Sequence, residues 1–384
     1  MVVRVLHVVN GLGTGGAERS LAELLPGFAR AGVESRVACL SRKHEGVHAR
    51  VEERGVPVTV VGPGRARSLV GLRRLIRDWH PDIVHTSIFD ADVLGRAAAV
   101  GTPARVLTSL VNTTYDGAAE ADPSISARRL AAVRAVDRFT ARHLTDHFHA
   151  ISPAVRDSAT AHLGIPADRV TVVPRGRDLG RLGAPSAARR RDVRDRLGLD
   201  SGAEVVLNVG RQEPQKGQDV LFRAVARLVE AHPDLVLVQA GRAGKSTAGL
   251  RTLVEELGLG ERVRLLGHRD DVGDLLAAAD VFAFPSVYEG LGGSVLEAMA
   301  MRVPVVVSDA PALVDVVAGG RAGVVVPVGD VEALAEALDR VLRTRALAGE
   351  LADRALEEFT GRFTLERSVA DMVTLFRDVL EGER

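Results

Sequence analysis

Residues 288–300 read Tyr-Glu-Gly-Leu-Gly-Gly-Ser-Val-Leu-Glu-Ala-Met-Ala and place a glycine-rich turn between two carboxylates. The run before them, 280–285, is apolar and favours a strand, and the run after the glycines has the composition of a helix. We therefore expect a strand, a loop and a helix in this order, which is the repeating unit of a parallel sheet covered by helices.

The residue types in this stretch suit a phosphorylated ligand. The backbone amides of Gly292, Gly293 and Ser294 would lie at the positive end of the helix, where a phosphate binds well. Glu297 falls about one turn into the helix, from where its carboxylate can accept two hydrogen bonds from a ribose. Glu289 lies on the loop and can face whatever is attached beyond the phosphates. The stretch predicts a nucleotide-sugar site.

Length and composition exclude several classes of protein. The 384 residues, 46% of them apolar, are too many for one ordinary core and fit two domains. Lys plus Arg equal Asp plus Glu at 50 each, so we expect no nucleic-acid partner. Cys39 is the only cysteine, which rules out an intrachain disulfide and a cysteine metal cluster. The first apolar run is too short to cross a membrane and has no signal-peptide cleavage site, so a cytoplasmic location is expected.

Short valine-rich runs alternate with helical patterns along the chain, which is typical of α/β folds with parallel sheets. In the first half the expected strands are Val3–Val9, Arg36–Leu40, Val56–Val61, Ile83–His85, Arg105–Val111, His147–Ala150 and Val170–Val173. In the second half they are Val205–Val209, Leu235–Gln239, Val263–Leu266, Val281–Phe284, Val303–Val307 and Gly323–Val326.

The pattern predicts two Rossmann-like, doubly wound domains with a cleft between the carboxyl edges of their sheets. The first domain is expected over 1–180 and the second over 201–362. The apolar pattern lapses over 181–200, which we take as the linker. The last stripe of apolar residues, 363–381, has helical spacing and needs a neighbouring domain to cover it.

The first strand ends in a glycine loop, 11–16, that fits the dinucleotide pattern G-x-G-x-x-G. A dinucleotide site also needs an acid after the second strand, and none stands there, so an NADP site would have to use Arg42. The loop could also be a tight turn without a ligand. We favour a third interpretation, in which Gly15 and Gly16 allow close approach of a phosphate or an acceptor.

A second loop follows the first strand of the second half and carries Gly210, Arg211 and Lys216. A guanidinium and an ammonium at this place can neutralise a diphosphate leaving group and do the work that a metal does elsewhere. The alternative is a pair of solvated surface charges. No metal site is expected.

A later loop, 267–272, contains His268 and Arg269. Its backbone could contact the edge of a nucleobase. Equally, it could be an ordinary turn that Asp270 or Asp271 caps.

Polar groups of the first half are candidate contacts for the acceptor or the transferred sugar. His85 ends one expected strand, and Asn112 and Thr113 follow another, although a histidine at such a place is more often structural. Asp90 and Asp92 form a D-x-D pair that could hold a metal. The simpler interpretation makes them the N-cap and a first-turn acid of the next helix.

A basic amphipathic helix is expected over 125–143, and the stretch 175–196 adds more arginines. The arginines of the helix are Arg128, Arg129, Arg134, Arg138 and Arg142. They could rest on an anionic membrane that carries a lipid acceptor, which would place the protein peripherally on the inner membrane face. We prefer the alternative of solvated faces balanced by Asp137, Asp192 and Asp195.

Taken in order, these motifs resemble those of the family-4 retaining glycosyltransferases of GT-B fold, over nearly the full chain. They are Gly15-Gly-Ala-Glu18, Gly210-Arg211 with Lys216-Gly217, Gly267-His-Arg-Asp-Asp-Val272, and the E-x₇-E element from Glu289 to Glu297. The resemblance implies a last helix that crosses back to the first domain. It also implies a donor bound by the second domain, no bound metal, no cofactor beyond the nucleotide-sugar cosubstrate, and retention of anomeric configuration.

The resemblance also implies a role for each donor-site residue. Arg211 and Lys216 would contact the diphosphate, Glu297 the ribose and Glu289 the sugar. The remaining donor-binding residues would be Gly15, Gly16, Gly210, His268, Arg269, Gly290, Gly292, Gly293 and Ser294. A UDP-sugar is the expected donor.

Two positions depart from the family pattern. Relatives often carry a histidine after the fifth strand, where this chain has Asn112, which can bond a hydroxyl but carries no proton charge. Near the hinge relatives often read Pro-Asn-Gly-Val-Asp, whereas this chain reads Pro-Arg-Gly-Arg-Asp over 174–178. Arg175 is therefore a candidate acceptor contact, unless the added guanidinium groups only solvate the hinge.

The sequence thus predicts an enzyme of the hexosyl- or N-acetylhexosaminyltransferase class that moves a sugar from a nucleotide diphosphate to a hydroxyl of a glycan, a lipid-linked glycan or a small molecule. Glu289, Arg211 and Lys216 are the expected catalytic residues. Two alternatives stay open: an NADP-dependent oxidoreductase that uses the 11–16 loop, and a nucleotide-sugar-binding protein that has lost turnover.

Overall fold

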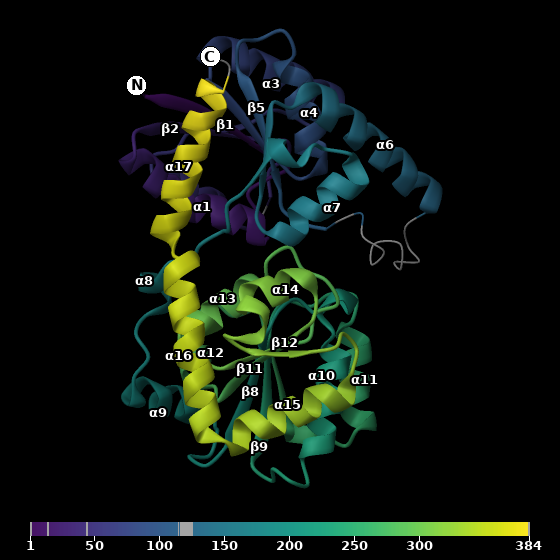
Figure 1. Cartoon of the computed structure of the whole chain (residues 1–384), viewed down its shortest axis with the longest axis vertical. Helices are drawn as coiled ribbons and strands as arrows, with labels where there is room; N and C mark the ends of the chain where they lie inside the picture. The colour runs from purple at the N-terminus through teal and green to yellow at the C-terminus, as the bar shows by residue number, and fades with distance from the viewer. Residues whose placement is uncertain (1, 14, 44, 114, 116–125, 383–384) are drawn as a thin grey trace. The chain divides into compact units, whose positions relative to one another are not determined.

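The fold is described from a computed structural model, which describes residues 2–13, 15–43, 45–113, 115 and 126–382. The chain divides into two compact units: unit 1 comprises Met1–Gly176 with Leu365–Arg384, and unit 2 comprises Arg177–Thr364. Their elements are labelled in Figure 1.

Unit 1 contains a seven-stranded parallel sheet in the order β3-β2-β1-β4-β5-β6-β7. Its strands are β1 (Val3–Val9), β2 (Val33–Cys39), β3 (Val58–Val60), β4 (Ile83–Ser87), β5 (Arg105–Leu110), β6 (His147–Ala150) and β7 (Val170–Val172). Its helices are α1 (Gly16–Arg30), α2 (His48–Glu53), α3 (Arg65–Trp79), α4 (Phe89–Ala99), α6 (Ala127–Leu144), α7 (Pro153–Leu163), the short η1 (Ala167–Arg169) and α17 (Leu365–Glu381).

Helices cover both faces of this sheet because successive residues of its central strand point to opposite sides. Val5 and Val9 of β1 belong to a core with α1 and α17, whereas Leu6 and Val8 belong to a core with α3 and α4. In Figure 1, α17 runs beside α1. Gly27 permits this close packing, because a Cβ there would overlap the side chain of Val369. The predicted return of the last helix to the first domain is confirmed.

Unit 2 repeats the arrangement with six parallel strands in the order β10-β9-β8-β11-β12-β13. The strands are β8 (Glu204–Val209), β9 (Leu235–Ala240), β10 (Val263–Gly267), β11 (Val281–Phe284), β12 (Val305–Ser308) and β13 (Val324–Val326). The helices are α8 (Leu179–Leu182), α9 (Ala187–Arg196), η2 (Pro214–Lys216), α10 (Gln218–Leu228), α11 (Thr247–Glu256), η3 (Gly260–Arg262), α12 (Val272–Ala278), α13 (Gly293–Ala300), α14 (Pro311–Val316), η4 (Ala318–Gly320), α15 (Val331–Arg343) and α16 (Arg345–Arg362).

Both sheets are doubly wound, as predicted, and each has a point where the strand order reverses. In unit 1 the reversal lies between β1 and β4, and in unit 2 between β8 and β11. Ligands of open α/β sheets bind at the carboxyl ends of strands beside such a reversal. We therefore expect ligand sites at the loops after β1 and β4 in unit 1 and at the loops after β8 and β11 in unit 2.

The arginine-rich stretch 181–200 is largely helical, and its charged side chains have structural partners. It contains α9, which belongs to unit 2. Arg190 and Arg194 both bind the carboxylate of Asp280, at 2.5 and 2.7 Å, while Arg189 and Arg196 bind that of Asp274. The prediction of a solvated arginine is wrong for Arg194, which is buried against Asp280. It agrees with the structure for Arg196, which is half exposed and also binds Asp192 at 3.2 Å.

The basic helix α6 is anchored by a buried ion pair, and its first expected residue, Ile125, lies outside the described residues. Asp137, which we expected on a solvated face, is buried and bonded to the guanidinium of Arg96 at 2.7 Å and the hydroxyl of Tyr115 at 2.8 Å. The opposite side of α6 leaves Val136 and Phe139 exposed among arginines. Among the described residues, no helix has the length and apolarity needed to cross a membrane.

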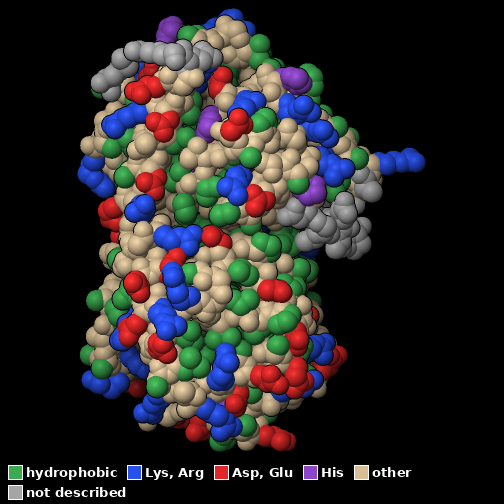
Figure 2. Space-filling model, viewed as in Figure 1, with side chains coloured by type: hydrophobic (Ala, Val, Ile, Leu, Met, Phe, Trp, Pro, Cys, Tyr) green, Lys and Arg blue, Asp and Glu red, His purple; other side chains and the backbone are tan. Residues whose placement is uncertain are grey.

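Charged side chains of both signs are interspersed over the face shown in Figure 2. This distribution agrees with the equal numbers of basic and acidic residues in the sequence.

Candidate functional site

Two loops of unit 2 come together at the carboxyl edge of its sheet, one after β8 and one after β11. The side-chain amide of Gln215 donates to the carbonyl of Tyr288 at 2.8 Å, and the amide of Val287 donates to the carbonyl of Gln215 at 2.8 Å. Gly217 is required at the junction because its φ is +59° and a Cβ there would overlap the carbonyl oxygen of Pro285. The local sequence Lys216-Gly217 thus fixes the lysine against the second loop.

Lys216 and Glu289, two of the predicted catalytic residues, form an ion pair between these loops. Both side chains are largely buried, and the ammonium of Lys216 also lies 5.1 Å from the centre of the Phe284 ring. An ion pair in such surroundings holds both groups in a defined position. The structure therefore brings these two predicted residues together.

Arg211, the third predicted catalytic residue, lies on the same loop with 65% of its side chain exposed and its guanidinium 3.9 Å from the carboxylate of Glu213. Its backbone is well fixed. The carbonyl of Gly210 accepts from the side-chain amide of Gln239 at 2.9 Å, and the carbonyl of Arg211 accepts from that of Gln218 at 3.0 Å. A long cationic side chain on a rigid loop can move to an anion without displacing the backbone.

The predicted glycine-rich start of a helix is present at α13. Gly292 occupies the position before the helix with a φ of +80°, and a Cβ there would lie 2.6 Å from the side chain of Leu313. Gly290 is buried in the loop, while Gly293 and Ser294 form the first turn. The first amides of a helix have no intrahelical partner and carry partial positive charge. This end of α13 has the chemistry of an anion site.

Glu297, the predicted ribose contact, is paired with two arginines that the sequence analysis did not place here. Its Oε1 lies 3.5 Å from Nε of Arg177 and 3.3 Å from a terminal nitrogen of Arg181. The substitution of arginine for the valine that relatives carry at position 177 was visible in the sequence. Its partner was not, because 120 residues separate it from Glu297.

The 267–272 loop carries a local ion pair. The guanidinium of Arg269 donates two hydrogen bonds to the carboxylate of Asp271, at 2.7 and 2.5 Å. His268 lies 3.4 Å from the carboxylate of Asp270. Asp271 precedes helix α12, but its side chain makes no capping bond. The expectation that an aspartate side chain caps this turn is therefore wrong for Asp271, whose carboxylate is committed to Arg269.

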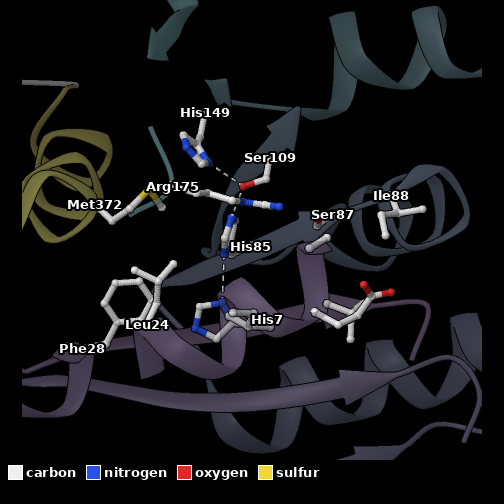
Figure 3. A pocket seen from close by; sticks show the side chains of 14 residues that line it. His7, Leu24, Phe28, His85, Ser87, Ile88, Ser109, His149, Arg175 and Met372 are labelled. Carbon is white, nitrogen blue, oxygen red and sulfur yellow. Dashed lines mark hydrogen bonds between the residues drawn. The ribbon is translucent and has the colours of Figure 1, made fainter. Parts of the chain in front are cut away.

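Unit 1 contains a pocket against the sheet face that α1 and α17 cover (Figure 3). The lining residues are His7, Val9, Ala17, Glu18, Leu21, Leu24, Phe28, His85, Ser87, Ile88, Ser109, His149, Arg175 and Met372. One part of this lining is apolar and comes mainly from the two helices. The other part is polar and comes from consecutive strands of the sheet.

A chain of hydrogen bonds runs across five strands at the polar side of this pocket. His7 bonds His85 through Nδ1 atoms 2.9 Å apart, His85 Nε2 lies 2.6 Å from Oγ of Ser109, and Ser109 Oγ lies 2.7 Å from Nδ1 of His149. His149 Nε2 ends the chain at the carbonyl oxygen of Val173, at 2.8 Å, and His7 Nε2 begins it near the hydroxyl of a serine of β2.

The carbonyl of Val173 fixes the direction of every bond in this chain. Since a carbonyl only accepts, His149 donates through Nε2 and accepts from Ser109 at Nδ1. Ser109 then accepts from Nε2 of His85, which leaves Nδ1 of His85 to accept from Nδ1 of His7. With all three rings neutral, each histidine has one defined tautomer in this chain.

Burial explains the neutral state. It lowers the pKa of His7 to about 3 and that of His149 to about 4. Burial, together with the neighbouring histidines and Arg175, also holds the pKa of His85 well below its usual range. His85, a candidate sugar contact, is therefore part of a structural network, and both of its ring nitrogens are hydrogen-bonded within that network.

Two features beside this network were not predicted. Ser87 is 9% exposed, and within the part of the chain that the structure describes its hydroxyl has no hydrogen-bond partner. The next residue, Ile88, has a φ of +77°, which is rare for a β-branched side chain and is often found at functional sites. Arg175, a candidate acceptor contact, reaches the same pocket.

The remaining candidates of the first unit lie at loop positions. Asn112 is exposed and its side-chain oxygen accepts from the amide of Thr113, which is buried. Gly15 and Gly16 are exposed at the start of α1, and the carboxylate of Glu18 folds back over Gly15 where a Cβ would overlap it. The absence of a side chain at Gly15 thus allows Glu18 to cover the helix start.

Asp90 and Asp92 both lie in the first turn of α4, but neither caps it. The residue before the helix is Ile88, and the side-chain oxygen of Asn10 accepts from the amide of Ala91 at 3.0 Å. The predicted cap by an aspartate is wrong because the loop after β1 supplies the capping group. Asp92 is buried, and its burial raises its pKa to about 6. Among the described residues, no three His, Cys, Asp or Glu side chains lie together as metal ligands would.

Comparison with known proteins supports the resemblance in both units. Residues 14–181 match the model of glycosyltransferase family 4, and residues 189–358 match that of the glycosyl transferases group 1. The chain is 33% identical to a D-inositol 3-phosphate glycosyltransferase of Corynebacterium urealyticum over 55% of its own length and 51% of that protein, and so matches about half of this relative.

Two further comparisons cover most of the chain. A lipopolysaccharide core biosynthesis mannosyltransferase of Rhizobium leguminosarum is 28% identical over 86% of the chain and 90% of the relative. The crystal structure of Anabaena HepE in complex with UDP and glucose superimposes with a TM-score of 0.85 at 22% identity, over 98% of this chain and 100% of that one. At this identity the likeness establishes the fold, which is GT-B. Because the two family models together account for residues 14–181 and 189–358, the chain belongs to the family-4 glycosyltransferases.

Proposed function

We propose that the chain is a retaining glycosyltransferase that moves a hexosyl or N-acetylhexosaminyl group from a UDP-sugar to a hydroxyl of its acceptor, without a resident metal. The observation that carries this proposal is the juxtaposition of Lys216 and Glu289 beside the start of α13. The cation and the helix start can hold the phosphates of such a donor, and the carboxylate can hold its sugar.

The chemistry at this site concerns the charge of the leaving group. As the bond between the sugar and the diphosphate breaks, negative charge grows on a phosphate oxygen. Lys216 is held in position by Glu289, and Arg211 is exposed on the same loop, so both cations can stabilise that charge. The carboxylate of Glu289 would accept a hydrogen bond from a hydroxyl of the transferred sugar. The proton of the acceptor hydroxyl would pass to the donor's own phosphate oxygen, as the family resemblance implies.

We place the acceptor hydroxyl in the polar part of the pocket in unit 1. Ser87 offers a buried hydroxyl without a partner among the described residues, and Arg175 reaches the same space. The neutral histidine chain behind them provides a fixed wall that neither gains nor loses protons near neutral pH. Asn112 is exposed just after the carboxyl end of β5 in the same sheet and is a further candidate contact for the sugar.

Screening for ligands tests the donor. UDP-sugars should raise the thermal unfolding temperature of the protein more than GDP-sugars, ADP-sugars or NADPH at the same concentration, because a ligand stabilises the state that it binds. Selective stabilisation by NADPH would instead support the oxidoreductase alternative. Nucleotide-sugar binding without turnover on any hydroxyl acceptor would support a binding protein.

The stereochemical and metal parts of the proposal need their own measurements. The anomeric proton of the product, followed by NMR from the start of the reaction, should show the configuration of the donor sugar. EDTA should leave the initial rate unchanged. Inversion at the anomeric carbon, or loss of rate that a divalent metal restores, would reject the corresponding part.

The exposed side of α6 supports a peripheral contact with anionic lipid. Phe139 is 62% exposed, and exposed arginines flank it on the same helix. An apolar side chain among arginines suits the interface of an anionic bilayer. Sedimentation with vesicles of phosphatidylglycerol should retain the protein at low salt, and Phe139→Ser should weaken this retention. No difference between anionic and neutral vesicles would contradict the contact.

A further inference from the structure

Arg177 and Arg181 of unit 2 pair with Glu297, the predicted ribose contact, and the proposed chemistry gives neither arginine a role. The two guanidinium groups share one carboxylate oxygen, at 3.5 and 3.3 Å. Arg177 and Glu297 are each 13% exposed, whereas Arg181 is 37% exposed. Arg177 is the better buried of the two arginines, whereas Arg181 lies closer to the carboxylate and donates a hydrogen bond to it.

The guanidinium of Arg177 also lies across the start of α13. A Cβ at Gly293 would overlap a terminal nitrogen of Arg177, so this arginine covers the first residue of the helix. Its backbone is tied down, since its amide donates to the carbonyl of Phe363 at 2.9 Å and it pairs with Thr364 in an isolated bridge. The side chain is thus anchored at one end and placed at its other end beside both a carboxylate and a helix start.

We propose that Arg177 makes donor binding depend on the phosphates by exchanging partners when the nucleotide binds. This inference rests on the proposed function and on the predicted role of Glu297, whose carboxylate would accept hydrogen bonds from the ribose hydroxyls. The ribose would take the carboxylate oxygen that Arg177 contacts. The guanidinium, released from Glu297 and already beside the first amides of α13, would then bond the diphosphate.

The exchange has a simple energetic consequence. A nucleoside without phosphates must separate Arg177 from Glu297 and offers the arginine no new anion. Loss of the Glu297 carboxylate is unfavourable for a largely buried guanidinium, so the nucleoside is penalised. A nucleoside diphosphate supplies the replacement partner, and a guanidinium fork matches two phosphate oxygens well. Arg177 therefore favours the diphosphate and disfavours the bare nucleoside at the same position.

The test compares UDP with uridine on the full-length protein, by competition against a fluorescent UDP analogue. Arg177→Ala should weaken UDP binding about 10- to 100-fold, the range expected for a bond between charged groups. The same variant should leave uridine binding unchanged or strengthen it, so the ratio of the two affinities falls. Arg177→Lys should restore part of the ratio, because it keeps the charge and loses the fork.

Arg227→Ala is the matched control, because it removes one arginine from an exposed ion pair of the same unit, with Glu332. It should leave both affinities unchanged. An equal loss for UDP and uridine in Arg177→Ala would show that the arginine only supports the local structure, and unchanged binding of both would show that it does not contact the nucleotide. Either result overturns the exchange. A wild-type protein that binds neither UDP, GDP nor ADP would instead reject the proposed function itself.

Discussion

The two sheets of this protein have the same strand order around their reversal points but opposite chemistry at their candidate sites. In unit 1 the polar groups beside the pocket form a neutral chain of three histidines and a serine whose bond directions are all determined. In unit 2 the polar groups are ion pairs, Lys216 with Glu289 and Arg177 with Glu297. One topology thus carries a chain of hydrogen bonds between buried histidines in unit 1 and ion-paired cations in unit 2. The first suits a neutral hydroxyl acceptor and the second a charged diphosphate.

The largest expected effect is a loss of stability in acid, which should be greater in unit 1 than in unit 2. The histidines of unit 1 have an ordinary pKa of 6.5 when unfolded and values of about 3 for His7 and about 4 for His149 when folded. Their contribution to stability is therefore fully present above pH 6.5 and is lost as the pH falls toward the folded values. Between pH 6.5 and 4.5 each should lower the free energy of unfolding by about 2.5 kcal/mol.

Hydrogen exchange measured by mass spectrometry at several pH values separates the two units. After correction for the intrinsic exchange rate, peptides of β1, β5 and β6 should lose protection below pH 6.5 before those of β8 and β11. His149→Gln should make the loss in unit 1 less steep. Equal acid sensitivity in both units, or in the variant and wild type, would contradict a neutral histidine chain.

Removal of the charge at position 216 should have the next largest effect. Lys216→Met should lower kcat by about 10²- to 10³-fold, as loss of a group that stabilises charge in the transition state does elsewhere. Lys216→Arg retains the charge in a different shape and should lose less. Steady-state kinetics with saturating donor and acceptor measure both, and an unchanged kcat in Lys216→Met would remove the lysine from the catalytic site.

Asp92 offers a change of stability in the direction opposite to that of the histidines. Burial raises its folded pKa to about 6, from a usual value of 3.8, so the protein is stabilised by protonation of this group. That stabilisation is present below pH 3.8 and is lost as the pH rises through 6. Asp92→Asn should therefore raise the free energy of unfolding at pH 8 by about 2 kcal/mol and have little effect near pH 4.

Thermal unfolding at the two pH values measures this change. Asp90→Asn is the control, because Asp90 lies on the same turn and forms an exposed ion pair with Arg65. It should be neutral or slightly destabilising. A gain in Asp92→Asn that is the same at both pH values would not come from the titration of this carboxyl.

The smallest effect is expected at Ser87, on the neutral side of the comparison. Ser87→Ala removes one hydroxyl from the pocket and should raise the KM for the acceptor by a few-fold, about the value of one neutral hydrogen bond. The KM for the donor and the value of kcat should stay the same. A rise in the donor KM of similar size would place Ser87 in the donor site and would blur the division between the two sheets.

The fold was predictable from the sequence because its signal is local and repeated. All thirteen expected strands occur, with ends that differ by up to three residues from the expected ones, as at Val33, where β2 begins before Arg36. Valine-rich runs buried on both faces and glycine turns after them repeat in both halves, so each repeat supports the others. The family was predictable for the same reason, since its motifs occupy the same turns in order.

The candidate site was predictable only in part. Lys216 and Glu289 could be named because each lies on a loop that follows a strand, and the carboxyl ends of parallel strands meet at one edge of the sheet. The partners of charged groups could not be read in this way. Arg177 pairs with Glu297, Arg194 pairs with Asp280 and Asn10 caps α4. In each case the two partners are far apart in the sequence.

The sequence alone determined the α/β alternation and the residue types available at the carboxyl ends of the strands, because strand and helix preferences and glycine turns act within a few residues. The tertiary structure decided which charges are neutralised and which hydrogen bonds have a fixed direction. Burial and pairing depend on groups brought together from distant parts of the chain, as Val173 is to His149 and Arg177 to Glu297. These long-range contacts separate a neutral pocket from a charged one on two sheets of the same design.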